Sequence, residues 1–113
     1  MIQRTTQKFV QSVEPVESVL LDFIEELPEA FQYPEITAVK VKYGESEVQT
    51  ENFVPSDRRL TSQTKTADGT LVRIDIVYLE ERPQRDDGPF LAEEQSMLDV
   101  LATLVGDYIE RKN

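Results

Sequence analysis

Cysteine, histidine and tryptophan are absent from all 113 residues of the chain. The lack of cysteine excludes disulfide bonds and thiolate metal sites. The lack of histidine removes the commonest general base, the commonest zinc ligand and any phospho-accepting histidine. Ser–His and Cys–His catalytic pairs therefore cannot form within the chain, and we expect a protein that is not an enzyme.

Glycine and long apolar runs are also scarce. The four glycines stand far apart, at positions 44, 69, 88 and 106, so no glycine-rich loop can cradle a phosphate and no cofactor is expected. No apolar run approaches the roughly 20 residues that span a bilayer, and the first residues contain no apolar signal core. We therefore expect a cytoplasmic protein that does not enter a membrane.

Positive charge is in short supply. The chain has 22 acidic residues against 12 lysines and arginines, a formal net charge of −10. A surface of this sign repels nucleic-acid phosphates and anionic lipids, so neither is expected as a partner. The length suits one domain with its own core, and we expect a single domain over residues 1–113.

Two segments have the apolar spacing of an amphipathic helix. The first runs from Phe9 to Leu27 and contains Pro15, which a first helical turn tolerates; with Pro28 as its stop, it predicts a helix over 14–27. Residues 1–11 are expected to be a helical extension or flexible. The second segment predicts a helix over 92–111, with the apolar positions Met97, Leu98, Leu101, Leu104, Val105, Tyr108 and Ile109.

Four strands are expected between the helices. Residues 36–43 and 70–79 alternate apolar and polar side chains, whereas 47–53 and 60–66 are more polar. Asp68-Gly69 is typical of a two-residue type I′ hairpin turn, which needs positive φ at both positions. Residues 54–59 and 80–88 are expected to be loops.

The order helix, four strands, helix predicts an α+β fold, because the short connections favour an antiparallel sheet. Both helices should pack on one face of this four-stranded sheet. The other face carries Lys40, Lys42, Arg73, Asp75 and threonines, and should be wet or covered by a partner. Val77 and Leu79 indicate that the last strand ends buried on both faces.

Two parts of the chain resemble a known family. Pro89-Phe90-Leu91-Ala92-Glu93-Glu94-Gln95, followed by spaced leucines and Ile109-Glu110-Arg111, resembles the terminal helix of GAF domains. Residues 33–38 (Tyr-Pro-Glu-Ile-Thr-Ala) and 77–83 (Val-Tyr-Leu-Glu-Glu-Arg-Pro) resemble a shortened GAF-like domain found in front of bacterial sensor histidine kinases. The resemblance covers about 20–112 and implies a sensory scaffold of a two-component system with a downstream kinase. The interval that usually builds the GAF ligand pocket is reduced here to 54–59.

The two helices suggest a homodimer. Apolar positions beyond those needed to cover the sheet can pair with a neighbouring helix, and a change in that pairing would pass to whatever follows Arg111. Our first hypothesis is therefore a non-enzymatic sensory or relay module that dimerises through Phe9, Val13, Val16, Leu20, Met97, Leu101, Leu104 and Tyr108.

Two other hypotheses use the wet sheet face. One is a small-ligand sensor beneath the 54–59 loop, and the other is a free-standing protein-interaction domain. Arg58, Arg59 and Arg73, with Lys40, form a candidate contact for an anionic ligand or a partner's carboxylate; otherwise they only balance an acidic surface.

The acidic residues are densest after the last strand. Their carboxylates have the oxygen chemistry of a calcium or magnesium site, but the spacing of a calcium loop is missing. We expect a solvated loop followed by a helix start, and no metal, at Glu80, Glu81, Asp86, Asp87, Glu93 and Glu94.

Overall fold

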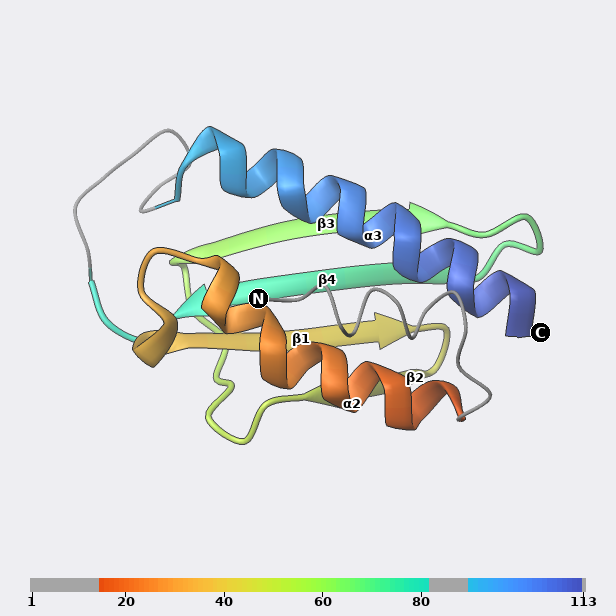
Figure 1. Ribbon diagram of the computed structural model, residues 1–113, viewed down its shortest axis with the longest axis horizontal. Helices are drawn as coiled ribbons and strands as arrows, with labels where there is room; N and C mark the ends of the chain where they lie inside the picture. Colours follow the sequence, from red (N-terminus) through yellow and green to blue (C-terminus); the bar gives the residue numbers. More distant parts are fainter. Residues whose placement is uncertain (1–14, 82–89, 113) are drawn as a thin grey trace.

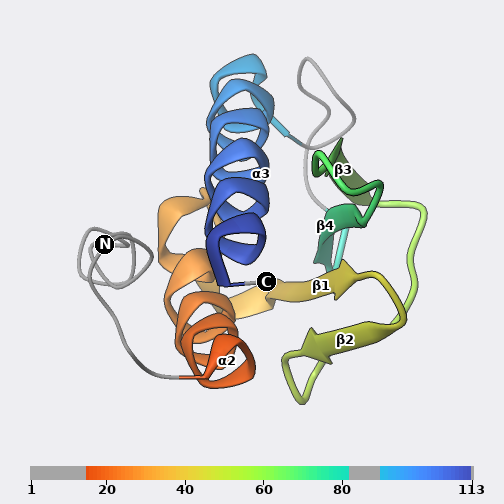
Figure 2. The ribbon, with the colours of Figure 1, turned by 90° about the vertical axis from the view of Figure 1, so that its right-hand side faces the viewer.

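The computed structural model describes residues 15–81 and 90–112 and confirms the α+β prediction. Both long helices lie on the same face of one sheet, and no described helix covers the opposite face (Figures 1 and 2). In chain order the elements are α2 (Val16–Glu26), the 3₁₀ turns η1 (Leu27–Ala30) and η2 (Pro34–Ile36), β1 (Thr37–Tyr43), β2 (Ser46–Gln49), β3 (Arg59–Lys65), β4 (Leu71–Tyr78) and α3 (Ala92–Lys112).

The four strands form an antiparallel sheet in the order β2-β1-β4-β3. In its register, Val41 lies opposite both Val48 and Ile74, and Ile74 lies opposite Ser62. Because successive side chains of a strand point to opposite faces, these residues face the helices. The side chains between them belong to the other surface, which we call the open face.

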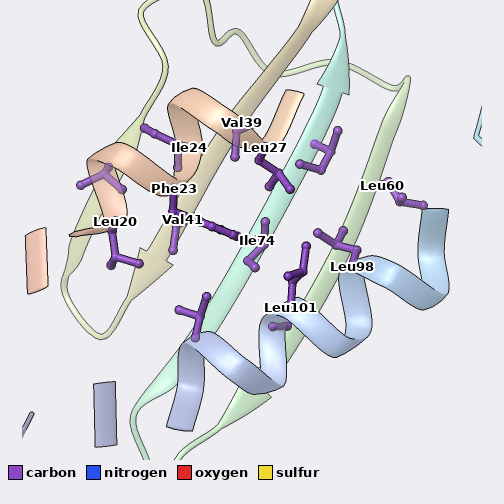
Figure 3. Close-up of a cluster of buried hydrophobic side chains, with 14 of the residues drawn as sticks. Leu20, Phe23, Ile24, Leu27, Val39, Val41, Leu60, Ile74, Leu98 and Leu101 are labelled. Carbon is purple, nitrogen blue, oxygen red and sulfur yellow. The ribbon is translucent and has the colours of Figure 1, made fainter. Parts of the chain in front are cut away.

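The core lies between the sheet and the two helices. Figure 3 shows side chains from α2 and α3 converging on β1 and β4. Phe23, Leu98 and Ile74 have no solvent-exposed surface, and full burial of each such side chain contributes about 1.5–3 kcal/mol. The predicted apolar positions of α2 and α3 therefore pack mainly against the sheet.

Helix α2 covers Val16–Glu26, which is within two residues of the predicted helix over 14–27 at both ends. Pro15 directly precedes the helix, and its carbonyl accepts a hydrogen bond from the Val19 N–H at 3.2 Å. The α-helix ends before Pro28, as predicted, and the chain continues as the 3₁₀ turn η1. A proline at the second position of such a turn loses no hydrogen bond within the turn, since the first N–H groups have no partner there. The predicted extension over 1–11 lies outside the described residues.

The predicted strand over 47–53 is wrong beyond Gln49. Thr50 still pairs with Val39, since its N–H donates to the Val39 carbonyl at 2.9 Å and its Oγ1 accepts the Val39 N–H at 3.1 Å. The Phe53 N–H then donates to the Thr50 carbonyl at 3.1 Å and closes a turn. This turn sends the β2–β3 loop toward the open face.

The β3–β4 hairpin is present, but its turn is not type I′. Gly69 has φ +90°, whereas Asp68 has no positive φ. The Asp68 carboxylate instead accepts hydrogen bonds from the Thr66 hydroxyl and from the Thr70 N–H, the latter at 3.1 Å. These bonds hold the pKa of Asp68 below its usual value, and the bond from Thr66 has the largest effect. Side-chain bonding thus replaces the expected backbone conformation.

Helix α3 approaches β3 very closely at Gly106. A Cβ atom on Gly106 would lie 2.8 Å from Cγ2 of Thr64. We expect Gly106→Ala to lower the free energy of unfolding by about 1 kcal/mol, because overpacking costs about 1–3 kcal/mol and the gain in helix propensity returns only about 1 kcal/mol.

Thr64→Ser removes the obstructing methyl group. In that background Gly106→Ala should be neutral or stabilising by up to about 1 kcal/mol. Urea denaturation of the four proteins in this double-mutant cycle measures the coupling. Strictly additive effects of the two substitutions would show that the contact with Thr64 is not the cause.

Candidate functional site

A basic hollow lies on the open face. Strand alternation places the cations there, and the register sets Lys42 opposite Arg73 and Lys40 opposite Asp75. The β2–β3 loop adds one wall. The hollow has a volume of about 250 Å³ and is lined by Lys40, Lys42, Phe53, Pro55, Arg59, Arg73, Asp75 and Val77.

Positive charge is concentrated in this basic hollow. Its lining includes four of the 12 lysines and arginines of the chain and one carboxylate. Lys40 pairs with Glu47 at 3.2 Å, and Arg73 pairs with Asp75 at 3.1 Å. Lys42 and Arg59 form no ion pair with any residue in the described ranges. The hollow therefore has a local excess of positive charge on a strongly acidic protein.

Asp75 holds Arg73 in place. Asp75 is 9% exposed, and its carboxylate accepts hydrogen bonds from the Thr61 hydroxyl at 2.6 Å and from Nε of Arg73 at 3.1 Å. The terminal nitrogens of Arg73 donate to nothing within 15–81 and 90–112. These planar donors suit a carboxylate or phosphate oxygen.

The wall of the basic hollow is partly apolar. Nζ of Lys40 lies 5.7 Å from the centre of the Phe53 ring, within cation–π range. Val77 is fully buried beneath the loop, as predicted for the end of its strand. A group that carries both an anionic oxygen and some apolar surface would match this lining.

The predicted arginine pair is divided between two roles. Nε of Arg58 donates to the Tyr78 carbonyl at 3.1 Å, and its Nη2 donates to the Leu79 carbonyl at 3.4 Å. Arg58 therefore ties the β2–β3 loop to the end of β4, while Arg59 joins Arg73 in the hollow. Phe53 was not predicted as a site residue, because an expected strand hid the turn that positions it. Pro55 belongs to the expected 54–59 loop, beneath which the small-ligand hypothesis placed its site.

The predicted dimer residues fall into three groups. Leu20, Leu101 and Tyr108 are at most 6% exposed within a single chain, so the core already covers them. Val16, Met97 and Leu104 are half-buried at the edge of the core. The remaining two, Phe9 and Val13, lie outside the described residues.

The outer face of α3 carries an apolar residue that the spacing did not single out. Val100 is 68% exposed. We define the outer face of α3 as this valine with its exposed or half-buried neighbours Glu93, Asp99, Thr103, Leu104 and Asp107. These six residues combine acidic and apolar side chains, and the exposed Arg111 lies one helical turn beyond Asp107.

The acidic residues near the start of α3 have a structural role. The buried carboxylate of Glu94 accepts the Leu91 N–H at 2.8 Å and the Gln32 N–H at 3.0 Å, which caps the helix and fixes it to the segment before β1. Among the residues that the structure describes, no group of three or more acidic side chains is placed to hold a metal ion. The predicted Asp86 and Asp87 lie outside the described ranges.

No known protein family, curated protein or solved structure matches this chain. Within the described ranges, no helix is both long enough and apolar enough to cross a membrane. The candidate site therefore rests on its own geometry.

Proposed function

We propose that this chain is a non-enzymatic sensory or relay module whose open face binds a carboxylate- or phosphate-bearing group. One observation carries the proposal: Lys42 and Arg59 line one hollow and lack an ion-pair partner in the described part of the chain. The GAF-like resemblance supports a place in a cytoplasmic bacterial signalling protein, with a downstream kinase as output.

The size of the basic hollow indicates what kind of group it takes. Its volume of about 250 Å³ is below the roughly 300–1,000 Å³ of pockets that enclose a drug-sized ligand. A small anion or the tip of a partner's acidic side chain fits better than a large enclosed ligand. Each charge-assisted hydrogen bond would contribute about 1.5–3 kcal/mol.

The sheet offers a direct route from the open face to the helices. Lys40 and Lys42 lie on β1, where they alternate with Val39 and Val41 of the core. Arg73 and Asp75 alternate in the same way with core residues of β4. An anion that draws the cations together would change strand twist beneath both helices, which supports a relay by repacking.

Titration with inorganic phosphate and with citrate, followed by amide NMR, tests the proposal. We expect chemical-shift changes to cluster around Lys42, Arg59 and Arg73. Arg59→Glu should weaken citrate binding at least about tenfold, which corresponds to the loss of one charge-assisted contact of about 1.4 kcal/mol or more.

Lys65→Glu is the matched control. Lys65 lies on the same strand as Arg59 and is exposed, but it does not line the basic hollow. The two substitutions change the net charge equally. Equal weakening by both, or shift changes scattered over the whole surface, would show that the hollow is not a specific site.

A further inference from the structure

The outer face of α3 and the open face are complementary in charge. The first has Glu93, Asp99 and Asp107 around the exposed Val100. The second has four cations around an apolar wall of Phe53, Pro55 and Val77. Each surface pairs an apolar centre with charges of one prevailing sign, and the signs are opposite.

The two surfaces lie on opposite sides of the molecule. Helix α3 covers the core side of the sheet, and the open face looks the other way (Figure 2). One chain therefore cannot bring its own two surfaces together. A contact between them requires two copies.

We propose that the outer face of α3 in one copy binds the open face of a second copy. This inference rests on the proposed function, because it identifies the anionic group on the open face as the carboxylates of α3. Asp107 forms no ion pair or hydrogen bond with another described side chain. Asp99 uses only Oδ1, which accepts bonds from Ser62 and Gln95 at 2.6 and 2.9 Å.

The spacing of the charges agrees on the two surfaces. Asp99 and Asp107 are eight residues apart on α3, which is about 12 Å along a helix. Arg59 is two strands away from Lys40 and Lys42 and lies level with Ala38 of their strand. The Cα atom of Arg59 is therefore about 12 Å from that of Lys40 and about 16 Å from that of Lys42. Long lysine and arginine side chains bridge the remaining difference.

A parallel dimer through the same helices is less favourable. Pairing two outer faces of α3 in parallel would set Glu93, Asp99 and Asp107 against the same residues of the other copy, and like charges in contact destabilise an interface. The head-to-tail contact avoids this. It also leaves one unused helix face and one unused open face at the ends, so further copies can add to form a chain or a ring.

Light scattering over a range of protein concentrations tests this contact, at about 0.15 M salt so that the overall negative charge is screened beyond about 8 Å. Wild-type mass should rise with concentration. Asp107→Lys disables the helix side and Lys42→Glu disables the sheet side, and each alone should leave a monomer. An equimolar mixture of the two variants should associate again, because it contains one intact surface of each kind.

Glu25→Lys and Lys65→Glu are the controls for the two charge reversals, since both positions are exposed and lie outside the outer face of α3 and outside the basic hollow. Both should assemble as the wild type does. A wild-type protein that stays monomeric up to about 1 mM, the concentration that corresponds to only about 4 kcal/mol of binding, would overturn the inference. Assembly that survives Lys42→Glu would also overturn it.

The Asp107→Lys variant separates this inference from the proposed function. It keeps the basic hollow intact and should bind citrate at least as well as wild type. If citrate binds but the wild type never associates, only the head-to-tail contact is wrong. If citrate does not bind the hollow in this monomeric variant, the proposed function is wrong as well.

Discussion

Leu101→Glu is expected to unfold the protein at room temperature. Leu101 is 6% exposed and packs from α3 into the core over β4 (Figure 3). Loss of a buried leucine costs about 2–5 kcal/mol, and the new carboxylate adds several more unless it is protonated. The sum reaches the whole stability of a typical domain, about 5–15 kcal/mol. Far-UV circular dichroism and urea denaturation measure the effect.

Val100→Glu is the matched control for this substitution. Val100 neighbours Leu101 on α3 but is 68% exposed. Since surface substitutions usually change stability by less than about 0.5 kcal/mol, this variant should unfold at nearly the wild-type urea concentration. If Leu101→Glu also remained folded with wild-type stability, the assignment of the core face of α3 would be wrong.

The second large effect is expected at alkaline pH, through Tyr78. Its side chain is fully buried, with ring centroids 4.3 Å from Phe90 and 5.5 Å from Tyr33. Burial raises the pKa of Tyr78, and the negative charge of Glu94 raises it further. Peptide groups of Gln32 and Tyr33 act in the other direction and are outweighed.

The raised pKa makes stability fall with rising pH. Below about pH 10, the ordinary tyrosine pKa, the hydroxyl is protonated in both the folded and the unfolded chain, so the stabilisation is fully present. Above it the unfolded chain loses a proton that the folded chain keeps, at a cost of up to about 1.4 kcal/mol per pH unit. We expect a loss of about 1–2 kcal/mol from this group between about pH 10 and 12.

Tyr78→Phe should remove this part of the alkaline loss. At neutral pH the variant should be as stable as wild type, or more stable by up to about 1 kcal/mol, because the Tyr78 hydroxyl has no hydrogen-bond partner among the described residues. Urea denaturation between pH 7 and pH 12 compares the two proteins. Parallel stability curves would indicate that solvent reaches the hydroxyl.

The sequence was sufficient for the fold because its two periodicities are clear. Alternation in β1 and β4 and the three-to-four spacing in α2 and α3 specify which faces are buried. The Thr50–Phe53 turn escaped prediction because Val48 and Phe53 fit a strand pattern, whereas the ladder ends where the Thr50 hydroxyl oxygen accepts the Val39 N–H. Competition of this kind between side chain and backbone is hard to recognise from residue types alone.

The site was predictable only in part. Alternation placed Lys40, Lys42 and Arg73 on one face, but the ion pair between Lys40 and Glu47 depends on the register of β1 against β2. Arg58 and Arg59 look equivalent in the sequence, and only the end of β4 decides that the first binds backbone carbonyls. Spacing likewise could not say which apolar residues of α3 would be left exposed.

The close approach at Gly106 means that a tilt of α3 would move its two ends by different amounts. The helix is 21 residues long, about 31 Å. Between Gly106 and Thr64 there is no room for one methyl group. Motion of the helix toward the sheet is therefore blocked at Gly106, and tilting of the helix about this point is favoured over translation. Since 14 residues separate Gly106 from Ala92 and only six separate it from Lys112, a tilt about this fulcrum moves the first end more than twice as far as the second. A small displacement of the carboxyl-terminal end of α3 would thus produce a larger displacement of the other end, near Phe90 and Glu94.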